Sequence, residues 1–265
     1  MPIILLGIIF VSILMGVLHV IARDKTLTSK MKRRIRLGQS KAGSKTKVVF
    51  VIAHPDDEVM FFSPTILNHV SDANKYEVYI LCLSTGNYYN KGSLRIQELY
   101  DSCNCLGVKL KNTFVIDERI LPDNPNIKWD KKFIAESVRN LVDKEDISVI
   151  FTFDQYGISG HSNHQDIYRG VQYLIYQDDC PEDIQAFQLV SVSIFRKYLS
   201  VLDTFYSYMT SSLIFTSPWL QVWKSQQAMC AHWSQFTWFR FLYIMFSRYM
   251  IINTYEPIDI PIELD

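Results

Sequence analysis

The chain has 265 residues, of which 48% are hydrophobic, and its formal net charge at pH 7 is zero, so it is long enough for one sizeable domain with appendages. Its charges are unevenly spread: residues 23–47 hold ten Lys and Arg against the single acid Asp24, whereas residues 48–265 hold 17 Lys and Arg against 26 Asp and Glu. An acidic main domain argues against nucleic acid as a partner.

The first predicted element is a membrane anchor. Residues 2–22 carry no charged side chain and are almost wholly apolar, and about 20 such residues span a bilayer core. A cleaved signal peptide is the alternative, but no basic residue precedes the apolar run. Because the basic stretch follows the run, the positive-inside rule places the remaining chain in the cytosol. We therefore expect a single transmembrane helix at 1–22 and a basic juxtamembrane linker at 23–46.

From residue 47 onward, predicted strands alternate with predicted helices. The order predicts an α/β fold, a Rossmann-like and mostly parallel sheet with helices on both faces. The five cysteines include no C-x-x-C pair, which favours reduced thiols in a reducing compartment. The strands are expected at 48–53, 77–83, 112–116, 148–153 and 185–192, and the helices at 92–106, 130–145 and 161–177.

The last third of the chain is rich in aromatic residues. We expect residues 199–223 to be irregular and residues 236–252 to form one apolar helix. Arg240 and Arg248 lie inside that helix, and they would be costly at the centre of a membrane. Two interpretations remain: a buried helix that closes the domain, or a helix at headgroup depth in a membrane. Residues 199–253 are therefore expected to contact the membrane in part.

Two polar clusters follow two of the predicted strands. His54, Asp56 and Asp57 come directly after the strand at 48–53, and His161 and His164 come shortly after the strand at 148–153. Ligands of open α/β sheets bind just past the carboxyl ends of the strands. Two His and one Asp leave a coordination position open, as in catalytic zinc sites. Singly, each residue has an ordinary structural explanation, such as a core His or an Asp at a helix N-terminus.

At these residues the chain resembles a known family. Residues 53–58 (AHPDDE) and 160–164 (GHSNH) are similar to the zinc-dependent, LmbE-like de-N-acetylases that act on N-acetylglucosaminyl-inositol compounds. Residues 84–90, 196–198 and 246–250 support the resemblance. It extends to about residue 253, which implies a catalytic domain at 47–253 and a tail at 254–265.

The resemblance implies a reaction and roles for individual residues. The reaction is hydrolysis of the acetamide of N-acetylglucosaminyl-phosphatidylinositol, an early step of glycosylphosphatidylinositol (GPI) anchor synthesis at the endoplasmic reticulum membrane. His54, Asp57 and His164 would hold Zn²⁺ or another divalent ion, Asp56 would act as general base, and His161 would stabilise the oxyanion as an imidazolium. Many bacterial relatives have an Asp where this chain has Asn163, which bears on the charge of His161.

Two further residues are expected to bind the substrate. By resemblance, Arg95 would contact the phosphate side of inositol, and Asp117 would hydrogen-bond sugar hydroxyls. A plain helix ion pair between Arg95 and Glu98, three residues apart, is the alternative for the first. A turn in which Asp117 caps its own backbone is the alternative for the second.

Other functions stay open at this point. A de-N-acetylase of another N-acetyl sugar conjugate would use the same site. Two His and one carboxylate also suit Fe²⁺ oxygenases, although the α/β pattern and a spare carboxylate beside the metal speak against them. A catalytically inactive membrane scaffold is the third alternative, and an intact Asp56 argues against it. Protein partners are not indicated by any motif.

Overall fold

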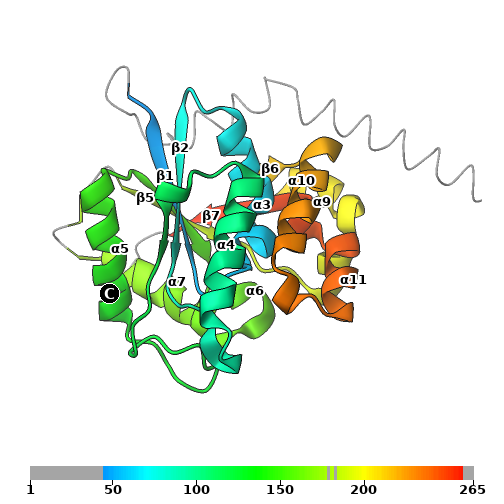
Figure 1. The fold of residues 1–265 in the computed structure, drawn as a ribbon. Coiled ribbons are helices and arrows are strands. Elements are labelled where there is room, and N and C mark those ends of the chain that lie inside the picture. Colours follow the sequence, from blue (N-terminus) through cyan, green and yellow to red (C-terminus); the bar gives the residue numbers. More distant parts are fainter. Residues whose placement is uncertain (1–43, 178–179, 182–183, 259–265) are drawn as a thin grey trace, which may run out of the picture.

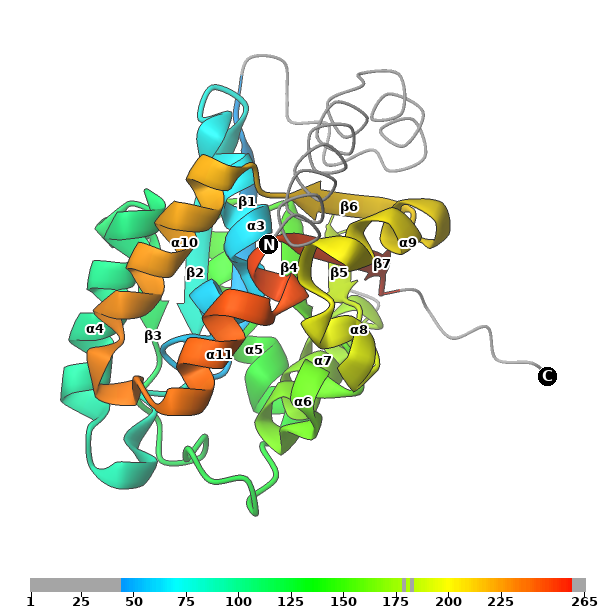
Figure 2. The same cartoon turned by 90° about the vertical axis from the view of Figure 1, so that its right-hand side faces the viewer.

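The computed structural model describes residues 44–177, 180–181 and 184–258 (Figures 1 and 2). The expected anchor at 1–22 and the expected linker, up to residue 43, lie outside these residues. Among the helices of the described part, none combines the length and the apolarity that a membrane crossing requires.

A seven-stranded sheet forms the centre of the molecule, in the order β3-β2-β1-β4-β5-β7-β6. The strands from β3 to β5 pair in parallel, and β7 runs antiparallel to both of its neighbours. The mostly parallel sheet predicted from the sequence is therefore confirmed. The strands are β1 (Thr46–Ile52), β2 (Tyr76–Cys82), β3 (Thr113–Val115), β4 (Val149–Phe153), β5 (Gln185–Leu189), β6 (Leu213–Thr216) and β7 (Ile252–Pro257).

β1 lies in the middle of the sheet because both of its faces are apolar. The side chains from Val48 to Ile52 have no exposed surface, as expected for a strand covered by helices on both sides. β1 pairs with β2 over its full length and with β4 from Val48 to Phe50. This register brings the carboxyl ends of β1 and β4 to the same edge, at the point where the strand order reverses.

Helices cover both faces of the sheet (Figure 1). α3 and α4 lie on one side of it, and α5 and α7 lie on the other. α5 begins where Asp130 accepts hydrogen bonds from the backbone N–H groups of Lys132 and Phe133, a standard helix N-cap. The helices are α3 (Asp57–Ser71), α4 (Gly92–Leu106), α5 (Lys131–Glu145), the short α6 (Gly157–Gly160) and α7 (Ser162–Ile175).

The segment from residue 190 to 251 differs from the sequence-based expectation. Residues 199–223 are not irregular, since they hold a helix, a strand and the start of a second helix. Short apolar runs cannot be assigned to helix or strand by periodicity alone. The elements between β5 and β7 are α8 (Ile194–Tyr198), α9 (Asp203–Thr210), β6, α10 (Trp219–Ala231) and α11 (Trp238–Phe246).

Residues 236–252 do not form one helix either. α11 ends at Phe246, a single 3₁₀ turn covers Arg248–Met250, and β7 begins at Ile252. The side chain of Ser247 accepts a hydrogen bond from the N–H of Tyr249, which starts the turn. Arg248 is fully buried and pairs with Asp203 at 2.8 Å. This buried ion pair lies directly before the last strand of the sheet. That strand, β7, continues past residue 253 to Pro257.

Candidate active site

The loop between β1 and α3 holds the first polar cluster in a fixed shape. Asp57 is the first residue of α3, and its Oδ2 accepts hydrogen bonds from the backbone N–H groups of Ala53 (3.0 Å) and His54 (2.9 Å). Asp56 has a φ of 117°, a left-handed conformation that costs a non-glycine residue about 1–3 kcal/mol. Such strain persists only where the surroundings impose it, so the backbone here positions Asp56.

The second cluster lies at the start of α7. The Nδ1 of His164 lies 3.1 Å from the carbonyl oxygen of Gly157, so this nitrogen carries the hydrogen and donates it. In the neutral ring the other nitrogen, Nε2, carries the lone pair, and it lies 3.2 Å from Oδ1 of Asp57. A histidine fixed by a backbone carbonyl on one side and open on the other is the usual arrangement of a metal ligand.

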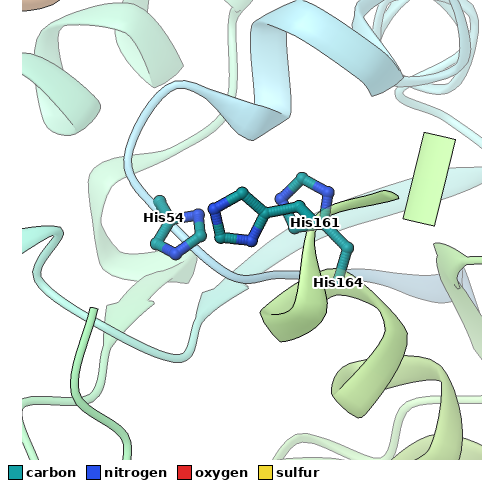
Figure 3. A group of neighbouring side chains, drawn as sticks. All are labelled: His54, His161 and His164. Atoms are coloured by element: carbon teal, nitrogen blue, oxygen red, sulfur yellow. The ribbon is translucent and has the colours of Figure 1, made fainter. Parts of the chain in front are cut away.

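Three histidines from the two clusters meet in one place (Figure 3). One ligand atom from each of His54, His161 and His164 lies within 4.8 Å of the others. Within the described residues, three of their ring nitrogens are buried without a hydrogen-bond partner: Nε2 of His54, Nδ1 of His161 and Nε2 of His164. Buried polar atoms are rarely left unsatisfied. Three unpartnered imidazole nitrogens this close together fit a transition-metal ion such as Zn²⁺, which imidazole binds well.

Charge coupling ties Asp57 to the histidines. Burial alone would raise the pKa of Asp57, but His164 and His54 outweigh it and hold the pKa well below its ordinary value. Burial would likewise lower the pKa of His164, but Asp57 outweighs it and the pKa is raised. The carboxylate is therefore ionised and ready to share a cation with its neighbours.

His161 has the opposite electrostatic setting. Burial, together with repulsion from His164 and His54, lowers its pKa to about 4. The ring is therefore neutral at pH 7 in this structure. Asn163 does not touch it: Oδ1 of Asn163 accepts a hydrogen bond from Ser162, and its Nδ2 faces the carbonyl oxygen of Pro122 at 3.4 Å. The imidazolium expected from the resemblance has no partner in this residue.

Asp123 joins the site from the loop between β3 and α5. Its Oδ1 lies 3.2 Å from Nε2 of His54, outside hydrogen-bonding geometry, and its Oδ2 lies 3.3 Å from Nη1 of Arg95. Burial raises the pKa of Asp123, but His54 and Arg95 outweigh it, so the pKa is lowered. Asp123 thus supplies a second ionised carboxylate beside the histidines.

A cavity of about 440 Å³ opens over these groups, within the usual size of a small-molecule site. Asp56 lies on its wall, with Oδ2 2.8 Å from Nη2 of Arg240 and 3.4 Å from Nη2 of Arg95. The residues that line the cavity are His54, Asp56, Asp57, Met60, Phe61, Tyr88, Tyr89, Arg95, Asp123, Pro125, His161, His164, Gln235 and Arg240.

Comparison with known proteins assigns the chain to a family. The profile of the family described as GlcNAc-PI de-N-acetylase matches residues 49–175, which hold both polar clusters. N-acetylglucosaminyl-phosphatidylinositol de-N-acetylase of Bos taurus is 39% identical over 85% of this chain and 88% of its own length. The chain belongs to the GlcNAc-PI de-N-acetylase family. A probable enzyme of the same name from Schizosaccharomyces pombe is 35% identical over 82% of this chain and 88% of its own length.

Solved structures show that the fold of this family member is shared more widely. N,N'-diacetylchitobiose deacetylase from Pyrococcus horikoshii aligns with a TM-score of 0.59 at 16% identity, over 89% of this chain and 92% of that chain. A 4-carboxy-2-hydroxymuconate hydratase from Pseudomonas putida aligns with a TM-score of 0.53 at 13% identity, over 83% and 99%. Since deacetylases and a hydratase share the fold, the fold alone does not decide the reaction.

The site of this family member brings together most of the residues expected from the sequence. His54, Asp56, Asp57, His161, His164 and Arg95 all line the cavity. The geometry groups His161 with the other two histidines, and Asp57 joins them through His164. Asp117 is exposed and is absent from the cavity wall. Glu98 does not pair with Arg95, because its two oxygens accept hydrogen bonds from the N–H and the hydroxyl of Ser234.

Two charged residues of the cavity wall, Asp123 and Arg240, were not predicted from the sequence. Asp123 stands six residues after Asp117, in a loop whose path the sequence does not reveal. Arg240 lies in a stretch that reads as an apolar helix, about 180 residues away from Asp56 along the chain. Its one signal was the presence of an arginine among aromatic residues.

Proposed function

We propose that the protein hydrolyses the acetamide of N-acetylglucosaminyl-phosphatidylinositol to acetate and glucosaminyl-phosphatidylinositol, an early step of GPI-anchor synthesis. One observation carries the chemistry: a carboxylate, Asp56, faces the same cavity as three buried imidazole nitrogens without partners. The relatives named for this reaction align along most of the chain, which supports the choice of substrate.

The donor set fits a zinc ion held by His54, Asp57 and His164. These three side chains are almost fully buried, and His164 has its tautomer fixed by Gly157. When bound, such an ion polarises an amide carbonyl and lowers the pKa of water toward neutrality. His161 is less buried and remains on the side of the cavity, where its neutral ring can donate a hydrogen bond to the carbonyl oxygen of the acetamide.

Asp56 is the proton carrier of the proposed reaction. It accepts a proton from the attacking water while the C–O bond forms, and it gives that proton to the nitrogen while the C–N bond breaks. Its strained backbone and its contacts with Arg95 and Arg240 fix the carboxylate. A base held in one orientation saves the ordering cost that a free carboxylate would meet in the transition state.

Membrane contact is part of the proposal because the substrate is a lipid. The helices α8 to α11 face the viewer in Figure 2. Large apolar side chains are exposed along this segment, and tryptophan favours the membrane interface. We call these side chains the aromatic surface: Ile194, Phe195, Tyr198, Leu199, Leu202, Phe205, Tyr206, Met209, Trp219, Leu220, Trp223, Trp233, Trp238, Phe239, Phe241, Leu242, Met245 and Phe246. The location that fits is the cytosolic face of the endoplasmic reticulum membrane, with the chain anchored once through residues 1–22.

The test is release of acetate from N-acetylglucosaminyl-phosphatidylinositol by membranes that carry the full chain. Wild type, Asp56→Asn and His164→Ala are compared with and without a chelator, and metal content is measured in parallel. We expect activity that zinc restores after chelation, loss of activity in both variants, and loss of metal in His164→Ala but not in Asp56→Asn. Activity that persists in Asp56→Asn would remove the general-base assignment. An inactive but metal-loaded wild type would point to another N-acetyl sugar or to a scaffold.

A further inference from the structure

Arg240 forms the part of the cavity wall that belongs to α11. Its side chain is 17% exposed, its Nη2 lies 2.8 Å from Oδ2 of Asp56, and its Nη1 contacts the sulfur of Met60. The hydroxyl of Tyr243, one turn further along α11, donates a hydrogen bond to the carbonyl oxygen of Met60 at 2.9 Å. α11 is therefore fastened to α3 at the point where Arg240 enters the cavity.

Arg95, which the sequence favoured for phosphate binding, is occupied by the protein itself. Its two terminal nitrogens donate hydrogen bonds to the carbonyl oxygens of Gly86 (2.9 Å) and Pro55 (2.8 Å), and they also face Asp56 and Asp123. The residue is 7% exposed. A Cβ built on Gly86 would lie 2.5 Å from this guanidinium, so the lack of a side chain at Gly86 makes room for Arg95. Arg95 braces the loop that carries Asp56.

Arg240 has donors to spare. A guanidinium offers five N–H groups, and within the described residues its polar contacts are Asp56 and the thioether of Met60, which is a weak acceptor. It is also the more accessible of the two arginines that face Asp56. A planar fork with free donors suits the paired oxygens of a phosphate.

Arg240 also stands where the cavity meets the aromatic surface. Its chain neighbours Phe239 and Phe241 are each 54% exposed. Between residues 194 and 250 the sequence contains a single carboxylate, Asp203, which is buried and paired with Arg196 and Arg248. This surface therefore presents no negative charge that would repel a phospholipid. A lipid-linked sugar bound here has its glycan in the cavity, its acyl chains at the aromatic surface, and its phosphodiester between the two.

We infer that Arg240 binds the phosphodiester of the substrate, an inference that rests on the proposed function. The phosphate sits on the inositol ring that carries the sugar, so it lies one ring beyond the N-acetylglucosamine whose acetamide reacts. Arg240 provides the cationic group at the end of the cavity that faces the aromatic surface, and Arg95 provides none. The site thus distinguishes phosphoinositol conjugates from neutral N-acetyl sugars.

The test uses two soluble substrates that differ only in the phosphate: N-acetylglucosaminyl-inositol phosphate and N-acetylglucosaminyl-inositol. The full chain is assayed as wild type, Arg240→Ala, Arg240→Lys and, as a matched control, Lys224→Ala, which removes an exposed cation from α10. The quantity measured is the ratio of kcat/KM for the two substrates. Hydrogen bonds to charged groups imply a wild-type preference for the phosphate of at least about tenfold.

We expect this ratio to fall toward one in Arg240→Ala, to fall less in Arg240→Lys, and to persist in Lys224→Ala. If Arg240→Ala lowers both values of kcat/KM by the same factor, Arg240 acts only through Asp56 and the inference is overturned. A wild type without preference overturns it as well, even if the variants do not fold. A wild type that hydrolyses neither of these compounds nor N-acetylglucosaminyl-phosphatidylinositol overturns the proposed function, and this inference with it.

Discussion

Nε2 of His232 lies 2.7 Å from Oε1 of Glu58, and neither residue has exposed surface. Burial would lower the pKa of His232, but Glu58 outweighs it and the pKa is raised, so the two residues form a charged pair. The other oxygen of Glu58 accepts the backbone N–H of Asp56 at 3.0 Å. The pair therefore holds the strained residue that carries the proposed base.

Breaking this pair is expected to affect both folding and catalysis. His232→Ala removes the cationic partner of the buried Glu58, which costs about 3–5 kcal/mol of the free energy of unfolding. Because the backbone of Asp56 loses its support, kcat should fall more than KM rises. Ser102→Ala is the control: it removes a second hydrogen bond to Glu58 at 2.6 Å but keeps the ion pair, so its loss should be small. Equal effects of both variants on kcat would argue against a positioning role.

Asp123 and Asp117 are expected to behave differently. Asp123 faces both His54 and Arg95, so Asp123→Asn should weaken metal binding about 10- to 100-fold, as loss of a carboxylate next to a ligand does. Asp117→Asn, an isosteric change at an exposed position, is the matched control. Zinc affinity by competition with a chelator measures the first effect. A rise of KM in Asp117→Asn would show that Asp117 binds the substrate after all.

His69 is expected to make stability depend on pH. It is 2% exposed and packs against Phe50 and Phe151, and burial lowers its pKa to about 4 from an ordinary value of 6.5. Between pH 6.5 and 4, His69 is protonated in the unfolded chain but stays neutral in the folded protein. The free energy of unfolding therefore falls as the pH drops through this window. The loss approaches about 3 kcal/mol. Denaturant unfolding at several pH values measures it, and in His69→Gln this part of the slope should vanish.

Gly170 is expected to tolerate no side chain. It lies on α7 where that helix crosses α5, and an added Cβ would come within 2.3 Å of Cγ2 of Ile134. Overpacking of this kind costs about 1–3 kcal/mol. Gly170→Ala should therefore lower the melting temperature while kcat stays near the wild-type value. Ile134→Ala costs about 2–5 kcal/mol by itself, but the double variant should lose less than the sum of the two changes, because the new methyl group fills part of the space left by Ile134. Simple additivity of the two changes would contradict the close packing.

The site residues at the ends of the strands were predictable from the sequence. The residues that reach the site from distant loops and helices were not. β1 and β4 are apolar on both faces and end in polar clusters, so His54, Asp57 and His164 could be placed at one edge of the sheet from pattern alone. Local chemistry fixes those positions: strand burial, a proline after β1 and a helix start.

Asp123, His232 and Arg240 reach the site through loops and helices whose course depends on packing of the whole chain. A histidine in the sequence 231–235 gives no sign that it will meet a glutamate 174 residues away. The same reason accounts for the segment after residue 199. Its aromatic residues are compatible with a helix or a strand, and the strands β6 and β7 are set by their pairing within the sheet.

The position of β7 has a consequence for how the protein is made. Among the strands that the structure describes, β6 pairs with β7 alone, and the place beside β5 also belongs to β7. A chain that emerges from the ribosome can pair β1 to β5 in order, but β6 has no strand to pair with until residues 252–257 have been synthesised. The sheet is therefore completed at the β6–β7 end only after the segment that carries Arg240 has been synthesised.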